Sequence, residues 1–203
     1  MRVHKKKHGA ERLLACGNIV IKDLRAEGNS SQALFGNDKP LRIEIGCGKG
    51  DFIVGTAAKE PDVNFLAVEK VSDVLVIAAE KVKASGLDNV RVCCIDAKEL
   101  TEIFEPHSID RIYLNFSDPW PKSRHEKRRL THRSFLDIYK TILKDDGEII
   151  YDVEVTMTNG KFFAFPSITK IIPSLKDSWL EDSKSIYGAT QKLAKGWEKK
   201  FSD

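Results

Sequence analysis

Long apolar runs, internal repeats and low-complexity linkers are all missing from this sequence. No apolar stretch approaches the roughly 20 residues that a membrane-spanning helix needs, and none follows the charged N-terminus as a secretory signal requires. We therefore expect a cytoplasmic protein without a membrane partner. The 203 residues suffice for one well-buried core, so a single domain over 1–203 is predicted.

Cysteine is scarce, and its spacing excludes two classes of small protein. The four cysteines are Cys16, Cys47, Cys93 and Cys94. They show neither the paired spacing of a zinc site nor the density of a disulfide-rich secreted domain. We expect reduced, mostly structural thiols and no metal.

Positive charge is in small excess, and its position is more informative than its total. The 33 Lys and Arg residues against 30 Asp and Glu residues give a net charge of +3, which does not by itself indicate a nucleic-acid partner. Many of the cations lie in two runs, at 2–7 and 122–129. The first run is expected to belong to a basic N-terminal arm over about 1–15.

Short β-rich runs alternate with helical patterns through most of the chain. Strands are predicted at 41–46, 63–69, 89–96, 108–116 and 147–155, and helices at 51–60, 72–85, 98–104 and 132–144. This alternation predicts a doubly wound α/β domain, with a mostly parallel sheet and helices on both faces. The segment 156–203 is less regular, with helical spacing only at 187–201.

Glycines and acids follow the first three predicted strands. Ligands of an open parallel sheet bind at the carboxyl ends of its strands. Gly46, Gly48 and Gly50 follow the first strand, where the missing side chains let a ligand lie against the backbone. Glu69 and Asp96 close the next two strands, where carboxylates can accept from ribose hydroxyls and from an adenine amino group. This set predicts a nucleoside-bearing cofactor.

The spacing of the glycines helps to identify the cofactor. The turn reads G-x-G-x-G, whereas dinucleotide sites read G-x-G-x-x-G and place a pyrophosphate at the helix N-terminus. Glu44 before the glycines and Asp51 after them would repel a pyrophosphate, but they suit the amino group and sulfonium of S-adenosylmethionine. S-adenosylmethionine is therefore favoured, and an NAD-dependent dehydrogenase is a weak alternative. Loop geometry and helix capping alone are a further alternative for these residues.

The stretch "NFSDPWPKSRHEKRR" follows the fourth predicted strand. Its two prolines hold the preceding residues, Asp118 and Trp120, extended in a stiff corner. Asp118 is expected over the position of the donor methyl group, and Trp120 offers a flat face for a base. The alternative is a rigid loop packed for stability, with Trp120 in the core.

Five cations follow this corner within eight residues. They are Lys122, Arg124, Lys127, Arg128 and Arg129. A charge run is often only solvated surface, but its position beside the predicted donor site favours binding of nucleic-acid phosphates.

Taken together, these motifs resemble the bacterial tRNA (guanine-N7)-methyltransferases, which have a Rossmann-like class I methyltransferase fold. The resemblance rests on "EIGCGKG", on Glu69 and Asp96, and on "YLNFSDPWPKSRHEKRRL", and it covers residues 1 to about 150. It implies methyl transfer from S-adenosylmethionine to N7 of a guanine in the variable loop of tRNA. By position it implies donor binding by Glu44, Glu69, Asp96 and Asp118, substrate contact by Lys122, and RNA contact by Arg124, His125, Lys127, Arg128 and Arg129.

The segment after the fifth predicted strand diverges from that family. The family has a Lys-Thr-Asp-Asn stretch whose Asp faces the guanine, where this chain reads "YDVEVTMTNGKFF". Counting forward from Gly147 places Glu154 at the position of that Asp. Counting back from "KFFAF" places Thr158 there, so both assignments stay open.

Methyl transfer to guanine N7 requires little acid–base catalysis. Guanine N7 carries a free lone pair and no proton, so the enzyme has to align the reactants and exclude water. Asp118, as the catalytic residue, or Glu154 would stabilise the positive charge that develops on the purine. Trp120 could offset the cost of unstacking the base.

Two other functions stay open from the sequence. One is a class I methyltransferase acting on another RNA base or an exocyclic amine, because "SDPW" is related to the Asp/Asn-Pro-Pro-aromatic corner of amino methyltransferases. The other is an RNA-binding homologue with impaired catalysis, because the stretch 152–159 is altered. A monomer and a homodimer are equally compatible with the sequence.

Overall fold

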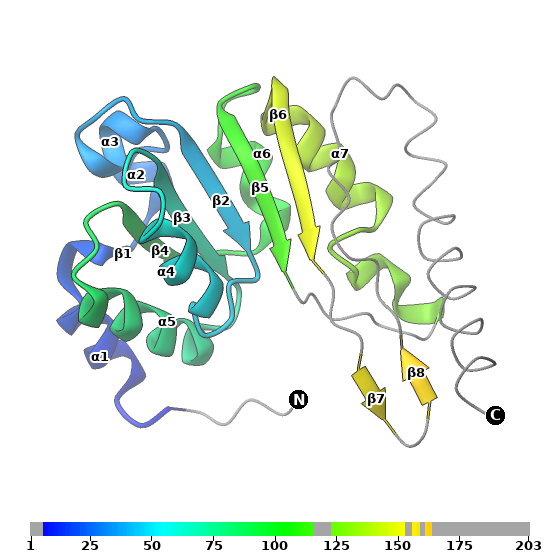
Figure 1. The fold of residues 1–203 in the computed structure, drawn as a ribbon, viewed down its shortest axis with the longest axis horizontal. Helices are drawn as coiled ribbons and strands as arrows, with labels where there is room; N and C mark the ends of the chain where they lie inside the picture. Colours follow the sequence, from blue (N-terminus) through cyan, green and yellow to red (C-terminus); the bar gives the residue numbers. More distant parts are fainter. Residues whose placement is uncertain (1–5, 116–122, 153–155, 159–160, 164–203) are drawn as a thin grey trace.

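The computed structural model describes residues 6–115, 123–152, 156–158 and 161–163, and its centre is a six-stranded parallel sheet (Figure 1). The strand order is β1-β4-β3-β2-β5-β6. The strands are β1 Val20–Ile21, β2 Leu41–Ile45, β3 Asn64–Glu69, β4 Val90–Cys94, β5 Ile109–Asn115 and β6 Leu143–Asp152. The predicted doubly wound α/β fold is confirmed.

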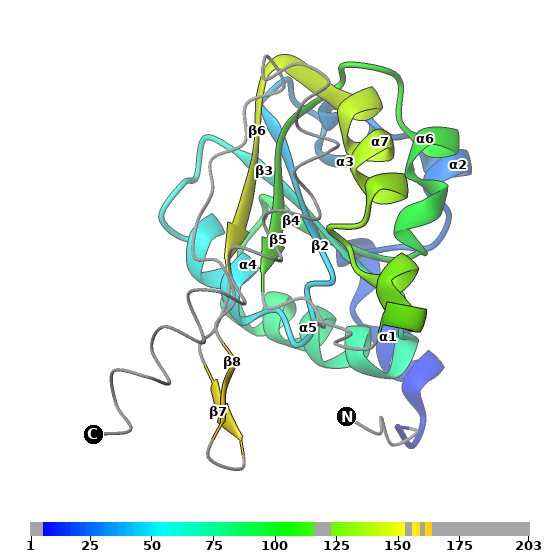
Figure 2. The same ribbon diagram turned by 90° about the vertical axis from the view of Figure 1, so that its right-hand side faces the viewer.

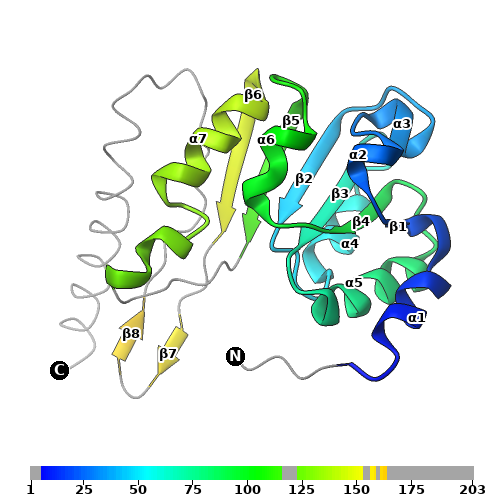
Figure 3. The same cartoon turned by 180° about the vertical axis from the view of Figure 1, so that it is seen from behind.

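Helices cover both faces of the sheet, and each face has its own apolar core (Figures 2 and 3). Helices α4 (Asp51–Ala57) and α5 (Ser72–Ser85) pack on one face. The other face is covered by α2 (Leu24–Glu27), α3 (Ser31–Phe35), α6 (Leu100–Ile103) and α7 (Arg133–Ile142). The central strands β3 and β4 are mostly apolar because both of their faces are buried.

The remaining described elements are short. They are α1 (Gly9–Ala15), the 3₁₀ helices η1 (Gly17–Ile19), η2 (Ala97–Glu99) and η3 (Ser123–Arg128), and the antiparallel pair β7 (Thr156–Thr158) and β8 (Lys161–Phe163). The backbone N–H of Lys6 donates to Asp73 Oδ1 at 2.7 Å, and Arg12 pairs with Glu80 at 2.7 Å. Residues 6–15 of the expected basic arm thus lie against α5.

Several predicted element boundaries are wrong. The helix expected over 132–144 ends at Ile142, and the strand expected from 147 already begins at Leu143. Leu143 pairs with Ile109 of β5 and is buried in the core, so it belongs to the sheet in spite of the Asp-Asp-Gly that follows. The strand expected over 89–96 ends at Cys94. The helix expected at 187–201 lies outside the described residues.

Two features are absent from the part of the chain that the structure describes. None of the described helices is long and apolar enough to cross a membrane. The described residues also hold no group of three or more His, Cys, Asp or Glu side chains arranged to bind a metal ion. The four cysteines are free, and only Cys94 is exposed.

Candidate active site

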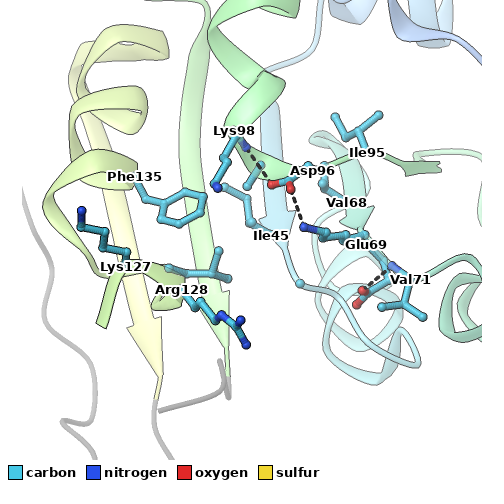
Figure 4. Close-up of a pocket in the computed structure, with 14 residues that line it drawn as sticks. Ile45, Val68, Glu69, Val71, Ile95, Asp96, Lys98, Lys127, Arg128 and Phe135 are labelled. Carbon is cyan, nitrogen blue, oxygen red and sulfur yellow. Dashed lines mark hydrogen bonds and ion pairs between the residues drawn. The ribbon is translucent and has the colours of Figure 1, made fainter. Parts of the chain in front are cut away.

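A cavity of about 640 Å³ opens where the carboxyl ends of β2, β3 and β4 meet η3 and α7 (Figure 4). Its polar lining includes Glu69, Asp96, Lys98, Lys127 and Arg128, and its apolar lining includes Ile45, Val68, Ile95, Leu130 and Phe135. Residues from the glycine turn, from two strand ends and from the basic run therefore line one cavity. A cavity of this size and mixed lining suits a small organic ligand.

The glycine turn lets the backbone form part of this wall. Gly46 lines the cavity with φ of 75°, a conformation that L-residues with side chains rarely adopt. Gly50 also has a positive φ, and a Cβ added there would lie 3.1 Å from Cβ of Ala78 in α5. The turn therefore requires glycine both for its backbone angles and for its close approach to α5.

Glu69, the last residue of β3, is held by two backbone donors. Its Oε2 accepts from the N–H of Gly48 at 3.1 Å, and its Oε1 accepts from the N–H of Val71 at 2.9 Å. A carboxylate has about four lone-pair sites, so it retains the capacity to accept from ribose hydroxyls. The predicted position of Glu69 beside the glycine turn is confirmed by these contacts.

Asp96 lies two residues beyond β4, so its prediction as the last residue of that strand is wrong. It caps η2, with Oδ1 accepting from the backbone N–H of Lys98 at 3.1 Å, and its Oδ2 pairs with Lys70 Nζ at 2.6 Å. Burial opposes its ionisation, but the Lys70 ion pair and the Lys98 N–H together hold the pKa of Asp96 below its ordinary value. Asp96 therefore faces the cavity as a carboxylate.

Glu44 is more deeply buried than the sequence suggested. Its side chain is 2% exposed, and it does not line the cavity. Burial raises the pKa of Glu44 to about 7. Hydrogen bonds from the Asn115 amide and the Ile53 backbone N–H lower this pKa, whereas the negative charges of Asp51 and Glu69 raise it further. Near neutral pH the free protein therefore holds this carboxyl partly protonated.

Asn115 is a buried neighbour of Glu44 that was not predicted from the sequence. It ends β5, is 5% exposed, and donates from Nδ2 to Glu44 Oε1 at 3.1 Å. A polar residue at the end of a buried strand was the only signal in the sequence. Asp51, in contrast, is exposed and paired with Lys81 outside the cavity.

The basic run forms η3 and reaches the cavity at its C-terminal end. Lys127 and Arg128 line the cavity, opposite Lys98 and Asp96 (Figure 4). Arg124, Lys127 and Arg128 are exposed, while His125 and Arg129 are half-buried. The run therefore divides between the cavity rim and the neighbouring surface.

Four predicted site residues lie outside the described residues. They are Asp118, Trp120, Lys122 and Glu154. Thr158, the alternative to Glu154, lies in β7 and pairs with Lys161 of β8.

Comparison with known proteins places the chain in a family. A family model described as "Putative methyltransferase" matches residues 38–195. A tRNA (guanine-N(7)-)-methyltransferase of Streptococcus equi subsp. zooepidemicus (strain H70) is 45% identical over 188 residues, covering 92% of this chain and 88% of the relative. One of Lactococcus lactis subsp. cremoris (strain SK11) is 40% identical over 203 residues, covering 100% and 92%.

A solved structure supports the fold. The structure titled "Structure of an Antibiotic Related Methyltransferase" superposes with a TM-score of 0.52 at 18% identity, covering 81% of this chain and 79% of that one. At this identity the likeness concerns the fold alone. The family match and the near full-length relatives carry the assignment: the chain belongs to the tRNA (guanine-N7)-methyltransferase family.

Proposed function

We propose that this protein transfers a methyl group from S-adenosylmethionine to N7 of a guanine in the variable loop of tRNA. The observation that carries this proposal is the shared cavity, in which Glu69 and Asp96 lie opposite Lys127 and Arg128. Acids that suit a nucleoside and cations that suit phosphate are thus brought to one place. The names of the relatives support the same activity, and action on tRNA implies a cytoplasmic location.

The lining of the cavity fits the donor. Glu69 retains free acceptor sites for ribose hydroxyls, and Asp96 is a carboxylate suited to an adenine amino group. Ile45, Ile95 and Phe135 add apolar surface on which a purine ring can pack. When bound, S-adenosylmethionine supplies an electrophilic methyl group. The chain itself binds the donor and the target base, orients them and excludes water.

The target base is proposed to contact residues of the Pro-Trp-Pro corner and of the segment 153–155. Guanine N7 needs no general base, because its lone pair is free. Asp118 is proposed to stabilise the positive charge that develops on the purine. Trp120 is proposed to stack on the base, and Lys122 and Glu154 to contact it. A carboxylate that accepts from guanine N1–H and from the exocyclic amino group would select guanine over adenine.

The RNA backbone is proposed to bind along η3 and the residue after it. Arg124, His125, Lys127, Arg128 and Arg129 are proposed to contact the phosphates that lead to the target base. Lys127 and Arg128 support this role most directly, because they are exposed and line the cavity. Phosphate contacts of this kind position the RNA without reading its sequence.

Replacing Lys127 and Arg128 with glutamine should weaken tRNA binding and reduce its salt dependence. Each lost phosphate contact lowers the log–log salt slope by about 0.7–0.9, so the double variant should lose roughly 1.4–1.8. Fluorescence anisotropy with labelled tRNA over a range of KCl concentrations measures this slope. The control is Lys59→Gln, an exposed lysine in the turn that leads into the start of β3. A slope equal to the control's would remove these two residues from the RNA interface.

Product analysis tests the proposed function and separates it from its two alternatives. The protein is incubated with methyl-labelled donor and tRNA that lacks the modification, and the RNA is digested to nucleosides. We expect label in N7-methylguanosine. Label in an exocyclic-amine product would favour the alternative methyltransferase, and donor and tRNA binding without any transfer would favour the impaired RNA-binding homologue.

A further inference from the structure

Cations face the mouth of the cavity from two elements that are separate in the sequence. Lys127 and Arg128 come from η3, and Lys98 comes from η2 on the opposite side. Figure 4 shows the side chain of Lys98 extending from η2 toward Phe135. All three cations are exposed, so they lie at the mouth of the cavity and not at its floor.

The ammonium group of Lys98 has no anionic partner in the described part of the chain. The backbone N–H of Lys98 donates to Asp96 Oδ1 at 3.1 Å, but its Nζ forms no ion pair there. Lys127 is likewise without an ion pair among the described residues. Lys70 differs, because it lines the same cavity with its Nζ 2.6 Å from Asp96 Oδ2. The charges of Lys98 and Lys127 are therefore available to a ligand, whereas that of Lys70 is already paired.

The proposed donor does not supply the missing negative charge. Its sulfonium and ammonium groups are positive and its one carboxylate is negative, so S-adenosylmethionine as a whole is a cation. Asp96 is proposed to bind the adenine amino group, and Lys98 is only two residues further along the chain. The adenine end of the donor is neutral, and the carboxylate lies at the other end of the molecule. Lys98 is therefore left for a different anion.

The other anion in the proposed reaction is the phosphate backbone of the tRNA. Lysine ammonium groups bind phosphates as compact point charges. The cations of η3 are already proposed to contact the phosphates that lead to the target base. An RNA strand that leaves η3 and passes over the mouth of the cavity would reach Lys98 on the opposite side.

The backbone beneath Lys98 is held in place from several sides. Asp96 and Glu99 form a capping box at the start of η2, in which Glu99 Oε1 accepts from the N–H of Asp96 at 3.3 Å. Arg25 of α2 pairs with Glu99 at 3.1 Å. The position of Lys98 is thus fixed although its side chain is exposed, and a fixed support lowers the entropic cost of binding.

We propose that Lys98 binds a further phosphate of the tRNA, so that the RNA backbone crosses the mouth of the donor cavity from η3 to η2. Lys98 acts as a positioning residue, which holds the substrate strand over the bound donor and takes no part in methyl transfer itself. The inference rests on the proposed function. It adds an element outside the run at 124–129 that the family resemblance assigns to RNA contact.

Replacing Lys98 with glutamine should reduce the salt dependence of tRNA binding without weakening donor binding. One lost phosphate contact lowers the log–log salt slope by about 0.7–0.9. Fluorescence anisotropy with labelled, unmodified tRNA over a range of KCl concentrations measures this slope, and calorimetry measures the affinity for S-adenosylhomocysteine. Lys98→Arg keeps the charge and should keep the slope. Circular dichroism verifies that the variants are folded.

Lys70→Gln is the matched control, because Lys70 is exposed and lines the same cavity but is paired with Asp96. It should leave the slope unchanged, as should Lys59→Gln outside the cavity. A slope for Lys98→Gln equal to that of Lys59→Gln would overturn the inference. An equal reduction in Lys70→Gln and Lys98→Gln would also overturn it, because the slope would then report the total charge of the cavity and not a contact of Lys98.

A triple variant tests whether the strand crosses the cavity. Lys98, Lys127 and Arg128 all replaced by glutamine should lower the slope by roughly 2.1–2.7, if Lys98 contacts a phosphate of its own. A triple variant with the same slope as the double variant at 127 and 128 would overturn the crossing.

The outcomes separate this inference from the proposed function. Formation of N7-methylguanosine together with an unchanged slope in Lys98→Gln would overturn the inference alone. Loss of S-adenosylhomocysteine affinity in Lys98→Gln with an unchanged slope would assign Lys98 to the donor and overturn the inference as well. A slope that depends on Lys98 in a protein that transfers no methyl group would support the RNA path and contradict the proposed function. Absence of tRNA binding by the wild type would contradict both.

Discussion

Replacing Asp118 with alanine should lower the turnover number for methyl transfer by about 10²–10³-fold, the usual cost of removing one group that stabilises transition-state charge. Positive charge passes to the purine as the methyl group is transferred, and a carboxylate beside the ring stabilises it. The phosphate contacts proposed for η3 do not depend on this carboxylate. We therefore expect the dissociation constant for tRNA to change little.

Asp118→Asn is the matched variant for this prediction, because it keeps the size of the side chain and removes the charge. Single-turnover kinetics at saturating donor and tRNA measure the chemical step, and anisotropy measures tRNA binding. Asp88, an exposed carboxyl just before β4, provides a control as Asp88→Ala. A parallel loss of rate and tRNA affinity in both Asp118 variants would show that Asp118 maintains the corner and does not act on the purine.

Replacing Glu44 with glutamine should stabilise the donor-free protein, and more strongly at alkaline pH. The pKa of Glu44 is raised from an ordinary 4.5 to about 7 in the folded state. The wild type therefore loses stability as the pH rises from about 4.5 to about 7, because ionisation is easier in the unfolded chain. A shift of this size corresponds to a free energy on the order of 3 kcal/mol. Glutamine does not ionise and avoids this loss.

Urea unfolding at about pH 5 and about pH 8 measures the difference between the two proteins. The free energy of unfolding of Glu44→Gln minus that of the wild type should increase by roughly 2–3 kcal/mol between the two conditions. In thermal unfolding this corresponds to roughly 4–12 °C for a chain of this size. Glu80→Gln provides the control. A difference independent of pH would mean that Glu44 is ionised at the same pH in the folded and unfolded states.

The main sheet was predictable because its central strands are short, β-rich and mostly apolar, and are bounded by glycines, prolines and acids. Their parallel arrangement followed from the helices between them. The elements before residue 41 were not predictable in the same way. β1 has only two residues, and α2 and α3 have four and five, too few for a periodic pattern. These segments take their structure from tertiary packing.

The site was predictable where a residue lies at the end of its strand or within two residues of that end. Glu69 and Asp96 were expected near the glycine turn from their positions alone, and both line one cavity. The burial of Glu44 could not be predicted in this way. It depends on the pairing of β2 with β5 and on Asn115, which is 71 residues away in the chain. Local sequence contains no information on such a pairing.

The ion pair of Lys70 with Asp96 could not be predicted from the sequence either. Lys70 follows β3 directly, and Asp96 follows β4, so the two meet only because these strands are neighbours. Lys98 reaches the cavity because Asp96 caps η2 and fixes the start of that turn. The cations that line the cavity therefore come from three separate segments, of which only the η3 run stood out as a charge cluster.

The most direct test of the central claim compares two tRNA transcripts that differ at one atom. One contains guanine at the variable-loop position, and the other contains 7-deazaguanine, which keeps N1–H, the carbonyl and the exocyclic amino group but has no N7. Methylation at N7 predicts methyl transfer to the first transcript and none to the second, with equal binding of both. Equal methylation of the two transcripts would contradict it.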